Sequence, residues 1–171
     1  MSEHKRGFLV LGPESSCTRL VTKILIVAGG CAGSYDHVQP FDDLPMGDAD
    51  NVVLRRSIPH GGQTPDLSSV ADMFGSRELL CVVAVRDWHC TAMSQVEVGL
   101  ASSFAVAKQR ISQATLTIWE FILSSGLPFV VVTAESLMLH PESAQRQLLE
   151  SIGLRYDQLV PIADCNDKHY Q

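Results

Sequence analysis

The stretch RGFLVLGPESSCTRLVTKILIVAGG, residues 6–30, contains the pattern that predicts the fold. Its apolar run at 8–11 has the length and composition of a strand buried on both faces in a parallel sheet. Turn residues follow at 12–16, and apolar residues then recur at helical spacing until Gly29 and Gly30, which favour a helix end. A strand, a tight polar loop and a helix in this order direct backbone N–H groups toward a phosphate or sulfate. The stretch predicts an anion-binding loop; serines that only cap a helix are an equal alternative.

The loop departs from the phosphate-binding pattern of ATPases and GTPases, which is G-x-x-x-x-G-K-[ST]. Gly12 is followed by PESS and then by Cys17, Thr18 and Arg19, so a Cys replaces the second Gly and a Thr replaces the Lys. The positive charge that lies against the β- and γ-phosphates in such proteins is therefore missing. An ATP- or GTP-hydrolysing protein fits this loop poorly.

A resemblance to sulfotransferases rests on two motifs. The segment from Gly12 to Arg19 resembles the 5′-phosphosulfate-binding loop of that family, which often reads G-T-T or G-T-R where this chain has Cys17-Thr18-Arg19. The family's second motif is an Arg at a strand end and a Ser eight residues later, which together hold the 3′-phosphate. Here Arg86 follows the apolar run VVAV, and Ser94 stands at that spacing. The chain resembles a short member of the sulfotransferase family.

The resemblance implies a P-loop-like α/β fold and 3′-phosphoadenosine 5′-phosphosulfate (PAPS) as sulfuryl donor, with no metal expected. His60 lies between the two motifs, about where many members have a catalytic His, and its ordinary pKa suits a general base. A polar turn residue beside Pro59 is the alternative role for His60. The acceptor is expected to be a small molecule or a carbohydrate, carrying a hydroxyl or amine. The donor-binding residues implied are Glu14, Ser15, Ser16, Cys17, Thr18, Arg19, Arg86 and Ser94.

The chain also departs from that family. Its loop lacks the Lys or Arg that usually balances the charge of the transferring sulfuryl group, so Arg19, Lys23, Arg55 or Arg56 is expected to supply it from another direction. Because Arg55 and Arg56 alternate across a strand, only one of them can face the site. The family's Arg-Lys-Gly loop, which closes on the 3′-phosphate, has no match, and Lys168 is a weak substitute for it.

Two other functions remain open. A nucleotide-binding or kinase-like protein that uses ATP and Mg²⁺ would need an acidic ligand at a strand end, for which Asp87 is the best candidate. A non-catalytic module that keeps the fold and the anion site is the other. The Mg²⁺ dependence of activity and the replacement of His60 would separate these from sulfuryl transfer.

Composition limits the class of protein. With 171 residues, 46% of them hydrophobic, the chain is expected to form one domain over residues 1–171. Its formal charge of −6 argues against a nucleic-acid binder, and no apolar run is long enough to cross a membrane. Five cysteines without C-x-x-C spacing suggest reduced thiols in a cytoplasmic protein. The chain is short for a sulfotransferase, so its acceptor pocket is expected to be small, open or completed by another subunit of a homo-oligomer.

The rest of the chain alternates between strand and helix patterns. Residues 79–85 form the most apolar strand, which is expected in the middle of a parallel sheet. Residues 129–133 are expected to be another buried strand, and 91–125 two helices broken near 99–103. The fold predicted is one α/β domain whose central parallel sheet has four or five strands, with helices on both faces. The remaining elements expected are a strand at 52–56 and helices at 66–74 and 142–152.

Overall fold

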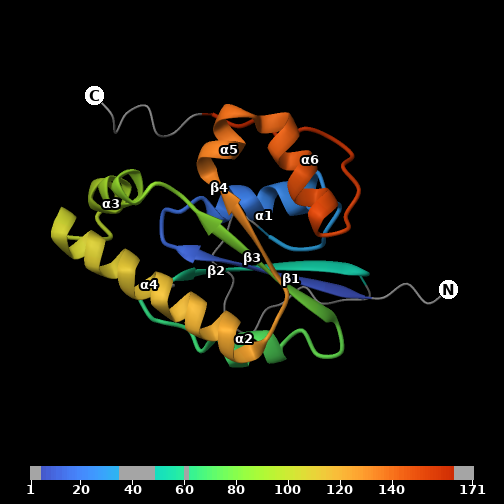
Figure 1. Ribbon diagram of the computed structural model, residues 1–171, viewed down its shortest axis with the longest axis horizontal. Helices are drawn as coiled ribbons and strands as arrows, with labels where there is room; N and C mark the ends of the chain where they lie inside the picture. The colour runs from blue at the N-terminus through green and yellow to red at the C-terminus, as the bar shows by residue number, and fades with distance from the viewer. Residues whose placement is uncertain (1–4, 35–48, 60–61, 164–171) are drawn as a thin grey trace.

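Four parallel strands form the centre of the computed structural model, which describes residues 5–34, 49–59 and 62–163. The strands run in the order β2-β1-β3-β4 across the sheet (Figure 1). The prediction of a parallel α/β sheet with four or five strands is confirmed, and the most apolar strand, β3, lies inside it. The bounds are Arg6–Pro13 for β1, Asn51–Ile58 for β2, Glu78–Val85 for β3 and Phe129–Thr133 for β4.

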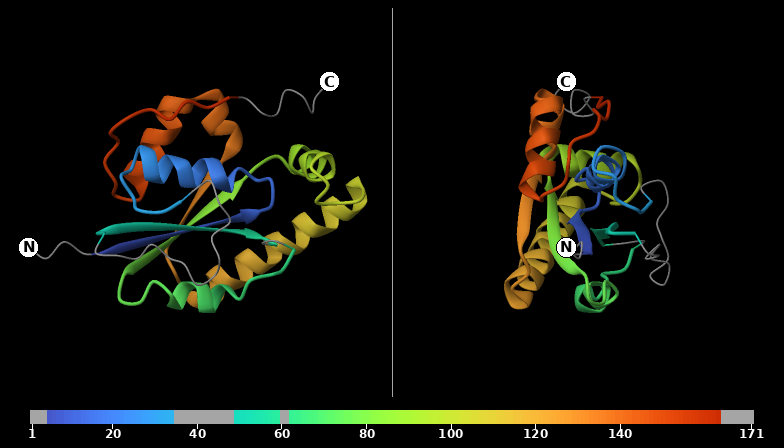
Figure 2. Two further views of the ribbon diagram at one scale, coloured as in Figure 1. Left: turned by 180° about the vertical axis from the view of Figure 1, so that it is seen from behind. Right: turned by 90° about the vertical axis from the view of Figure 1, so that its right-hand side faces the viewer.

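Helices cover both faces of this sheet, as the two views in Figure 2 show. On one face, α1 (Thr18–Val27) and α6 (Pro141–Ser151) pack over Phe8 and Val10, with α5 (Ala134–Leu139) beside them. On the other face, α2 (Leu67–Asp72) and α4 (Phe104–Ser125) pack over Leu9 and Leu11. Successive residues of β1 thus serve opposite cores, because side chains alternate along a strand. Among the described residues, no helix is both long and apolar enough to cross a bilayer.

The helices agree with most of the sequence pattern. The predicted break near 99–103 separates α3 (Trp88–Glu97) from α4, whose N-cap Ser103 accepts a hydrogen bond from the Val106 N–H. Asp66 caps α2 by accepting from the Ser68 N–H at 3.1 Å. Helix α5, whose six residues follow β4 directly, was not predicted.

The expectation that residues 129–133 form a buried strand is wrong. β4 lies at the edge of the sheet and pairs with β3 alone within the described part of the chain. Phe129 is 45% exposed and Val131 is 48% exposed. An apolar, β-branched run has the same sequence pattern in a central strand and at an edge, so composition alone could not locate it.

The strand order locates the point where a ligand is expected. From β1 the chain continues through α1 to β2 on one side, whereas from β3 it continues through α3 and α4 to β4 on the other. The neighbouring strands β1 and β3 therefore send their connections in opposite directions. In open α/β sheets, ligands bind at the carboxyl ends of such a pair, because the diverging loops leave a crevice there.

Candidate anion-binding site at the carboxyl ends of β1 and β3

The loop between β1 and α1 has an unusual backbone. Ser15 has φ of 68° and Cys17 has φ of 69°, which is the left-handed region that non-glycine residues rarely adopt. Cys17 is the N-cap of α1, and its side chain makes no capping hydrogen bond. The first N–H groups of a helix have no intrahelical acceptor, so the start of α1 offers donors that can bind an anion. Strain of this kind tends to be kept at functional sites.

Gly12 allows the loop to lie directly against β3. A Cβ at this position would come within 2.3 Å of Ser16 Oγ and 2.6 Å of the Ala84 carbonyl oxygen. Ser16 is 1% exposed, and its hydroxyl has no hydrogen-bond partner among the described residues. A buried polar atom without a partner is costly and calls for a ligand, a water or another function to explain it.

Arg86 connects the two motifs that the sequence singled out. Its Nη1 donates a hydrogen bond to the Ser15 carbonyl at 3.1 Å, so the end of β3 is joined to the loop after β1. Arg86 is half-buried, which limits the solvent screening of its charge. Ser94 is half-buried on α3, and its predicted contact with the same ligand stays a prediction. The structure thus brings Arg86 and the loop together.

Two residues that the sequence did not indicate hold the loop from its other side. Gln95, which is fully buried on α3, donates from Nε2 to the Glu14 carbonyl at 2.8 Å. Arg110 on α4 forms an ion pair with Glu14, with 3.1 Å between Nη2 and Oε2, and also donates to the Leu100 carbonyl. No spacing rule links these residues to the loop, and the only signal was a Gln on the buried face of a helix.

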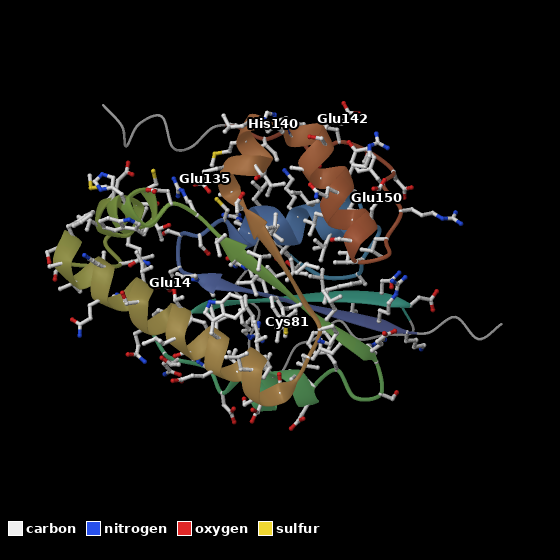
Figure 3. All side chains as sticks on the ribbon, viewed as in Figure 1. Glu14, Cys81, Glu135, His140, Glu142 and Glu150 are labelled. Atoms are coloured by element: carbon white, nitrogen blue, oxygen red, sulfur yellow. The ribbon has the colours of Figure 1, made fainter. Side chains whose placement is uncertain are left out.

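Glu14 is therefore fixed by α3 and α4, and Figure 3 shows it beside α4. Its side chain is 11% exposed. Burial raises the pKa of this carboxyl above its ordinary value of 4.5, while the positive charge of Arg110 works against that rise. The carboxylate is held by α4, and the backbone of the same residue is held by α3. Glu14 thus positions the loop, whatever contact it makes with a ligand.

The two arginines of β2 lie on opposite faces of the sheet, as alternation required. Arg55 is level with Val10, on the face that α1 covers, whereas Arg56 is level with Leu11 on the face of α2 and α4. The pKa of Arg55 is lowered first by burial and then by the charge of Arg19 in the first turn of α1. Arg55 is therefore the one of the pair that shares a face with the loop and Arg19.

Arg56 is nearly inaccessible, at 1% exposure. Its Nη1 donates to the Arg55 carbonyl at 2.9 Å. Burial, and then the charge of Arg55, lowers its pKa. Arg56 is thus buried on the face away from α1 and Arg19, so Arg55 and Arg19 are the better candidates for the missing charge.

The acidic residues beside the site have structural contacts. Asp87 caps α3 by accepting from the Cys90 N–H at 2.9 Å, and its own N–H donates to Glu135 Oε1 at 2.9 Å. Glu135, in the first turn of α5, thus ties the end of β4 to the end of β3. Within the described residues, no group of three or more His, Cys, Asp or Glu side chains is arranged to hold a metal ion.

Two predicted residues, His60 and Lys168, lie outside the described residues, and their roles stay predictions. The residues directly before His60 are described: β2 ends at Ile58, level with Pro13, and the Ile58 carbonyl accepts from the Glu14 N–H at 3.1 Å. The chain therefore leaves β2 beside the loop that follows β1.

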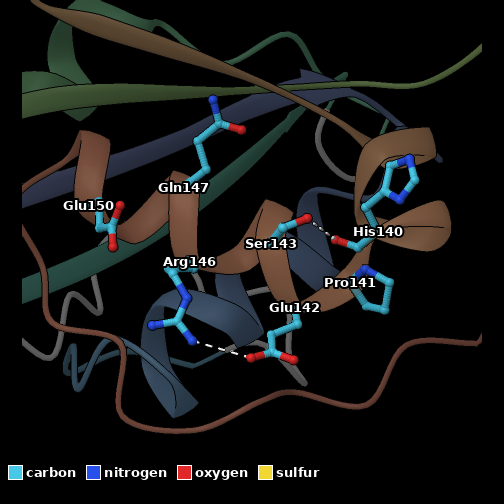
Figure 4. Close-up of a pocket in the computed structure, with 7 residues that line it drawn as sticks. All are labelled: His140, Pro141, Glu142, Ser143, Arg146, Gln147 and Glu150. Atoms are coloured by element: carbon cyan, nitrogen blue, oxygen red, sulfur yellow. Dashed lines mark hydrogen bonds and ion pairs between the residues drawn. The ribbon is translucent and has the colours of Figure 1, made fainter.

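A shallow hollow on α6 lies away from this site and contains none of the predicted site residues (Figure 4). It is lined by His140, Pro141, Glu142, Ser143, Arg146, Gln147 and Glu150. Glu142 and Arg146, four residues apart on an exposed helix face, form an ion pair at 3.2 Å. Such a pair contributes little to stability or to a binding site.

Comparisons with family models, with curated proteins and with solved structures find no match to this chain. The functional argument therefore rests on the loop, on its contacts, and on the likeness of the two motifs to those of sulfotransferases.

Proposed function

We propose that this protein transfers a sulfuryl group from PAPS to a hydroxyl or amine of a small-molecule or carbohydrate acceptor. The observation that carries the proposal is the hydrogen bond from Arg86 Nη1 to the Ser15 carbonyl. It joins the two motifs that resemble the donor-binding motifs of sulfotransferases, although they stand 71 positions apart in the chain. Both motifs lie at the carboxyl ends of β1 and β3, whose connections leave in opposite directions. This is the expected ligand position in a sheet of this order.

In this proposal the donor lies across the carboxyl ends of β1 and β3. Backbone N–H groups of Ser15, Cys17, Thr18 and Arg19, and the hydroxyl groups of Ser16 and Thr18, hold the 5′-phosphosulfate; the Ser16 N–H donates to the Pro13 carbonyl within the loop. Arg86 and Ser94 hold the 3′-phosphate. Arg55 and Arg19 offset the charge on the transferring group in place of the Lys that the loop lacks, because they share the face that α1 covers.

The reaction needs little covalent chemistry from the protein. The acceptor oxygen or nitrogen attacks the sulfur, the bond from sulfur to the bridging phosphate oxygen breaks, and adenosine 3′,5′-bisphosphate leaves. His60 takes the proton from the acceptor, since an imidazole has a suitable pKa. Positioning and charge stabilisation supply the rest of the rate. Loss of the Arg55 charge is expected to lower turnover by about 10²–10³, by analogy with the loss of one oxyanion donor.

Titration calorimetry with adenosine 3′,5′-bisphosphate tests the donor site. We expect micromolar binding to the wild type and no comparable binding of ATP with Mg²⁺. Arg86→Ala should weaken binding of the bisphosphate at least tenfold. Arg146→Ala, which removes an exposed arginine on α6, should leave the affinity unchanged. A wild-type protein that binds ATP with Mg²⁺ equally well, or that binds no bisphosphate, would contradict the proposal.

Replacement of His60 separates an enzyme from a non-catalytic anion-binding module. His60→Ala should keep bisphosphate affinity and lower sulfuryl transfer by about 10²–10⁴, the usual contribution of a general base. His140→Ala is the matched control, because His140 is exposed at the junction of α5 and α6. Equal turnover in the two variants would remove His60 from the mechanism.

A further inference from the structure

The outer edge of β4 carries backbone groups that point away from the sheet. The Cys81 N–H donates to the Pro128 carbonyl at 2.9 Å, so the backbone groups of residue 128 face β3. Successive residues of a strand alternate in this direction, and Val130 and Val132 therefore also face β3. The N–H and C=O groups of Phe129 and Val131 consequently face outward. An edge of this kind is a template for pairing with another strand.

This edge lacks the features that usually protect an exposed strand. Phe129–Thr133 has no charged residue and no proline. The side chains of Phe129 and Val131, whose backbone groups face outward, are both about half exposed. A groove of about 340 Å³ runs along it toward α6, and none of its lining residues is ionisable. In Figure 1 β4 crosses the front of the sheet, and the right-hand view of Figure 2 shows it at the margin between α6 and α4. The groove is lined by Val130, Val131, Val132, Thr133, Ser136, Ala144, Gln147, Leu148 and Ser151.

An apolar stripe on α4 continues this surface on the other side of β4. The rings of Trp119 and Phe129 lie 5.4 Å apart, which fixes the face of α4 that adjoins the edge. Leu116 and Leu123, three residues before and four residues after Trp119, occupy the same face of the helix. They are 57% and 79% exposed. Glu120 borders the stripe and does not interrupt it, because adjacent residues on a helix point about 100° apart.

We propose that this surface binds a second copy of the chain, with the two β4 strands antiparallel about a two-fold axis at Val131. Val131 then faces its own copy as a hydrogen-bonded pair, and Phe129 faces Thr133 of the second copy. The sheet becomes continuous over eight strands. The two α4 stripes meet on one face, and the uncharged residues of the two grooves meet on the other.

Charge favours a second copy over a foreign partner. The chain has a formal charge of −6, so two copies repel one another over most of their surfaces. The β4 strand and its groove carry no ionisable side chain, so these parts of two copies can meet without opposing like charges; the α4 stripe beside them is bordered by the negative charge of Glu120. A different protein would be selected by complementary charge, which this strand and groove do not offer. β-Branched and aromatic residues opposite one another also stabilise antiparallel pairs.

Sedimentation velocity over a concentration series tests the pairing. We expect a monomer–dimer equilibrium for the wild type, and at least a tenfold weaker dimer for Val131→Lys, which would place two positive charges opposite one another. Val98→Lys is the matched control, because Val98 is 60% exposed directly after the end of α3, away from β4. It should leave the dimer unchanged. A wild type that stays monomeric at every concentration, or that forms only larger aggregates, overturns the proposal.

A second variant separates pairing from folding. Val131→Pro removes an outward N–H and no hydrogen bond to β3, so it should abolish the dimer and keep the circular dichroism spectrum of the wild type. Val131→Cys should form an intermolecular disulfide, because hydrogen-bonded antiparallel pairs have Cα atoms about 5.5 Å apart, within disulfide range. Wild type, with its native thiols, is the control. A folded Val131→Pro protein that still dimerises, or no disulfide in a dimeric Val131→Cys protein, overturns the register proposed.

This inference does not depend on the proposed function. Val131→Lys should bind adenosine 3′,5′-bisphosphate as the wild type does, because Val131 lies on the outer edge of the sheet and the loop follows an inner strand. If Val131→Lys loses the dimer and still binds the bisphosphate, both proposals are supported. A wild-type protein that dimerises without binding the bisphosphate overturns only the donor site.

Discussion

The loop after β1 and the edge strand β4 depart from ordinary residue preferences in opposite ways. The loop buries polar groups: Ser16 is 1% exposed without a hydrogen-bond partner for its hydroxyl among the described residues, and Gln95 beside the loop is fully buried. β4 instead exposes apolar groups, with Phe129 and Val131 each about half accessible. Both departures cost stability in the isolated chain, since buried polar atoms lose water and exposed apolar atoms order it.

The difference indicates what each region is missing. Buried polar groups are satisfied by polar or charged ligands, and an exposed apolar edge is satisfied by another strand. The loop is held in one conformation by the contacts of Glu14 and Arg86, and two of its residues have left-handed backbones. The unfavourable free energy of its strained backbone and buried polar groups therefore cannot be relieved by a local change of conformation. The edge has no comparable strain and depends only on its surroundings. Substitutions in the loop should therefore change stability strongly, and substitutions at the edge should change association.

The largest effect is expected at Gly12. Gly12→Ala should lower the free energy of unfolding by about 2–3 kcal/mol and remove bisphosphate binding, since an added Cβ would meet the Ala84 carbonyl oxygen, a backbone atom that cannot rotate away. Urea denaturation measures the first effect and calorimetry the second.

Gly30→Ala is the control for Gly12→Ala. Nothing lies within 4 Å of a Cβ at this position, but its φ is +68°. Only the backbone cost applies, so we expect a loss of about 1 kcal/mol with binding retained. Equal losses of stability and equal binding in the two variants would show that the loop has room to adapt.

A smaller effect is expected at Cys17, where the backbone is left-handed. Cys17→Gly should keep stability within about 1 kcal/mol of the wild type, because glycine accepts this conformation without strain but costs chain entropy. Cys17→Val should lose about 1–2 kcal/mol, since a β-branched side chain disfavours it. The comparison uses thermal and urea unfolding of both variants. A valine variant as stable as the glycine variant would contradict the strain assigned to the loop.

The pH dependence of stability tests the burial of Glu14. Its pKa is raised in the folded protein above 4.5, chiefly by burial, so the folded state holds the proton more tightly than the unfolded state. Stability therefore falls as pH rises through the window that begins at about 4.5 and ends at the folded pKa. Glu14→Gln should remove this part of the pH dependence, measured as the difference between urea curves of the two proteins. Glu142→Gln, at an exposed pair on α6, should not remove it.

The smallest effect on stability is expected at the edge surface. Leu123→Lys should change the unfolding free energy of the monomer by no more than about 0.5 kcal/mol, because Leu123 is 79% exposed. The same change should weaken the dimer in sedimentation experiments. A loss of several kcal/mol at low protein concentration would show that Leu123 is packed within the monomer, and the contrast with the loop would disappear.

Much of the fold followed from local pattern. The apolar runs located four strands, and their parallel arrangement followed from the helical segments between them. The turn at 12–16 followed by a helical period predicted the loop where it lies. The helix expected at 66–74 is α2 with its cap Asp66, and the break between α3 and α4 was placed correctly. These features depend on residues close together in the chain, so the sequence determined them directly.

The tertiary structure decided what depends on contacts between distant residues. The sequence could not show that Gln95 and Arg110 hold Glu14, 81 and 96 positions away, because no periodicity connects them. It could not choose between Arg55 and Arg56 until the strand order showed which face α1 covers. It predicted β4 as buried, because an apolar strand has the same composition in the middle of a sheet and at its edge. Local propensity is set by neighbours in the chain, whereas burial is set by neighbours in space.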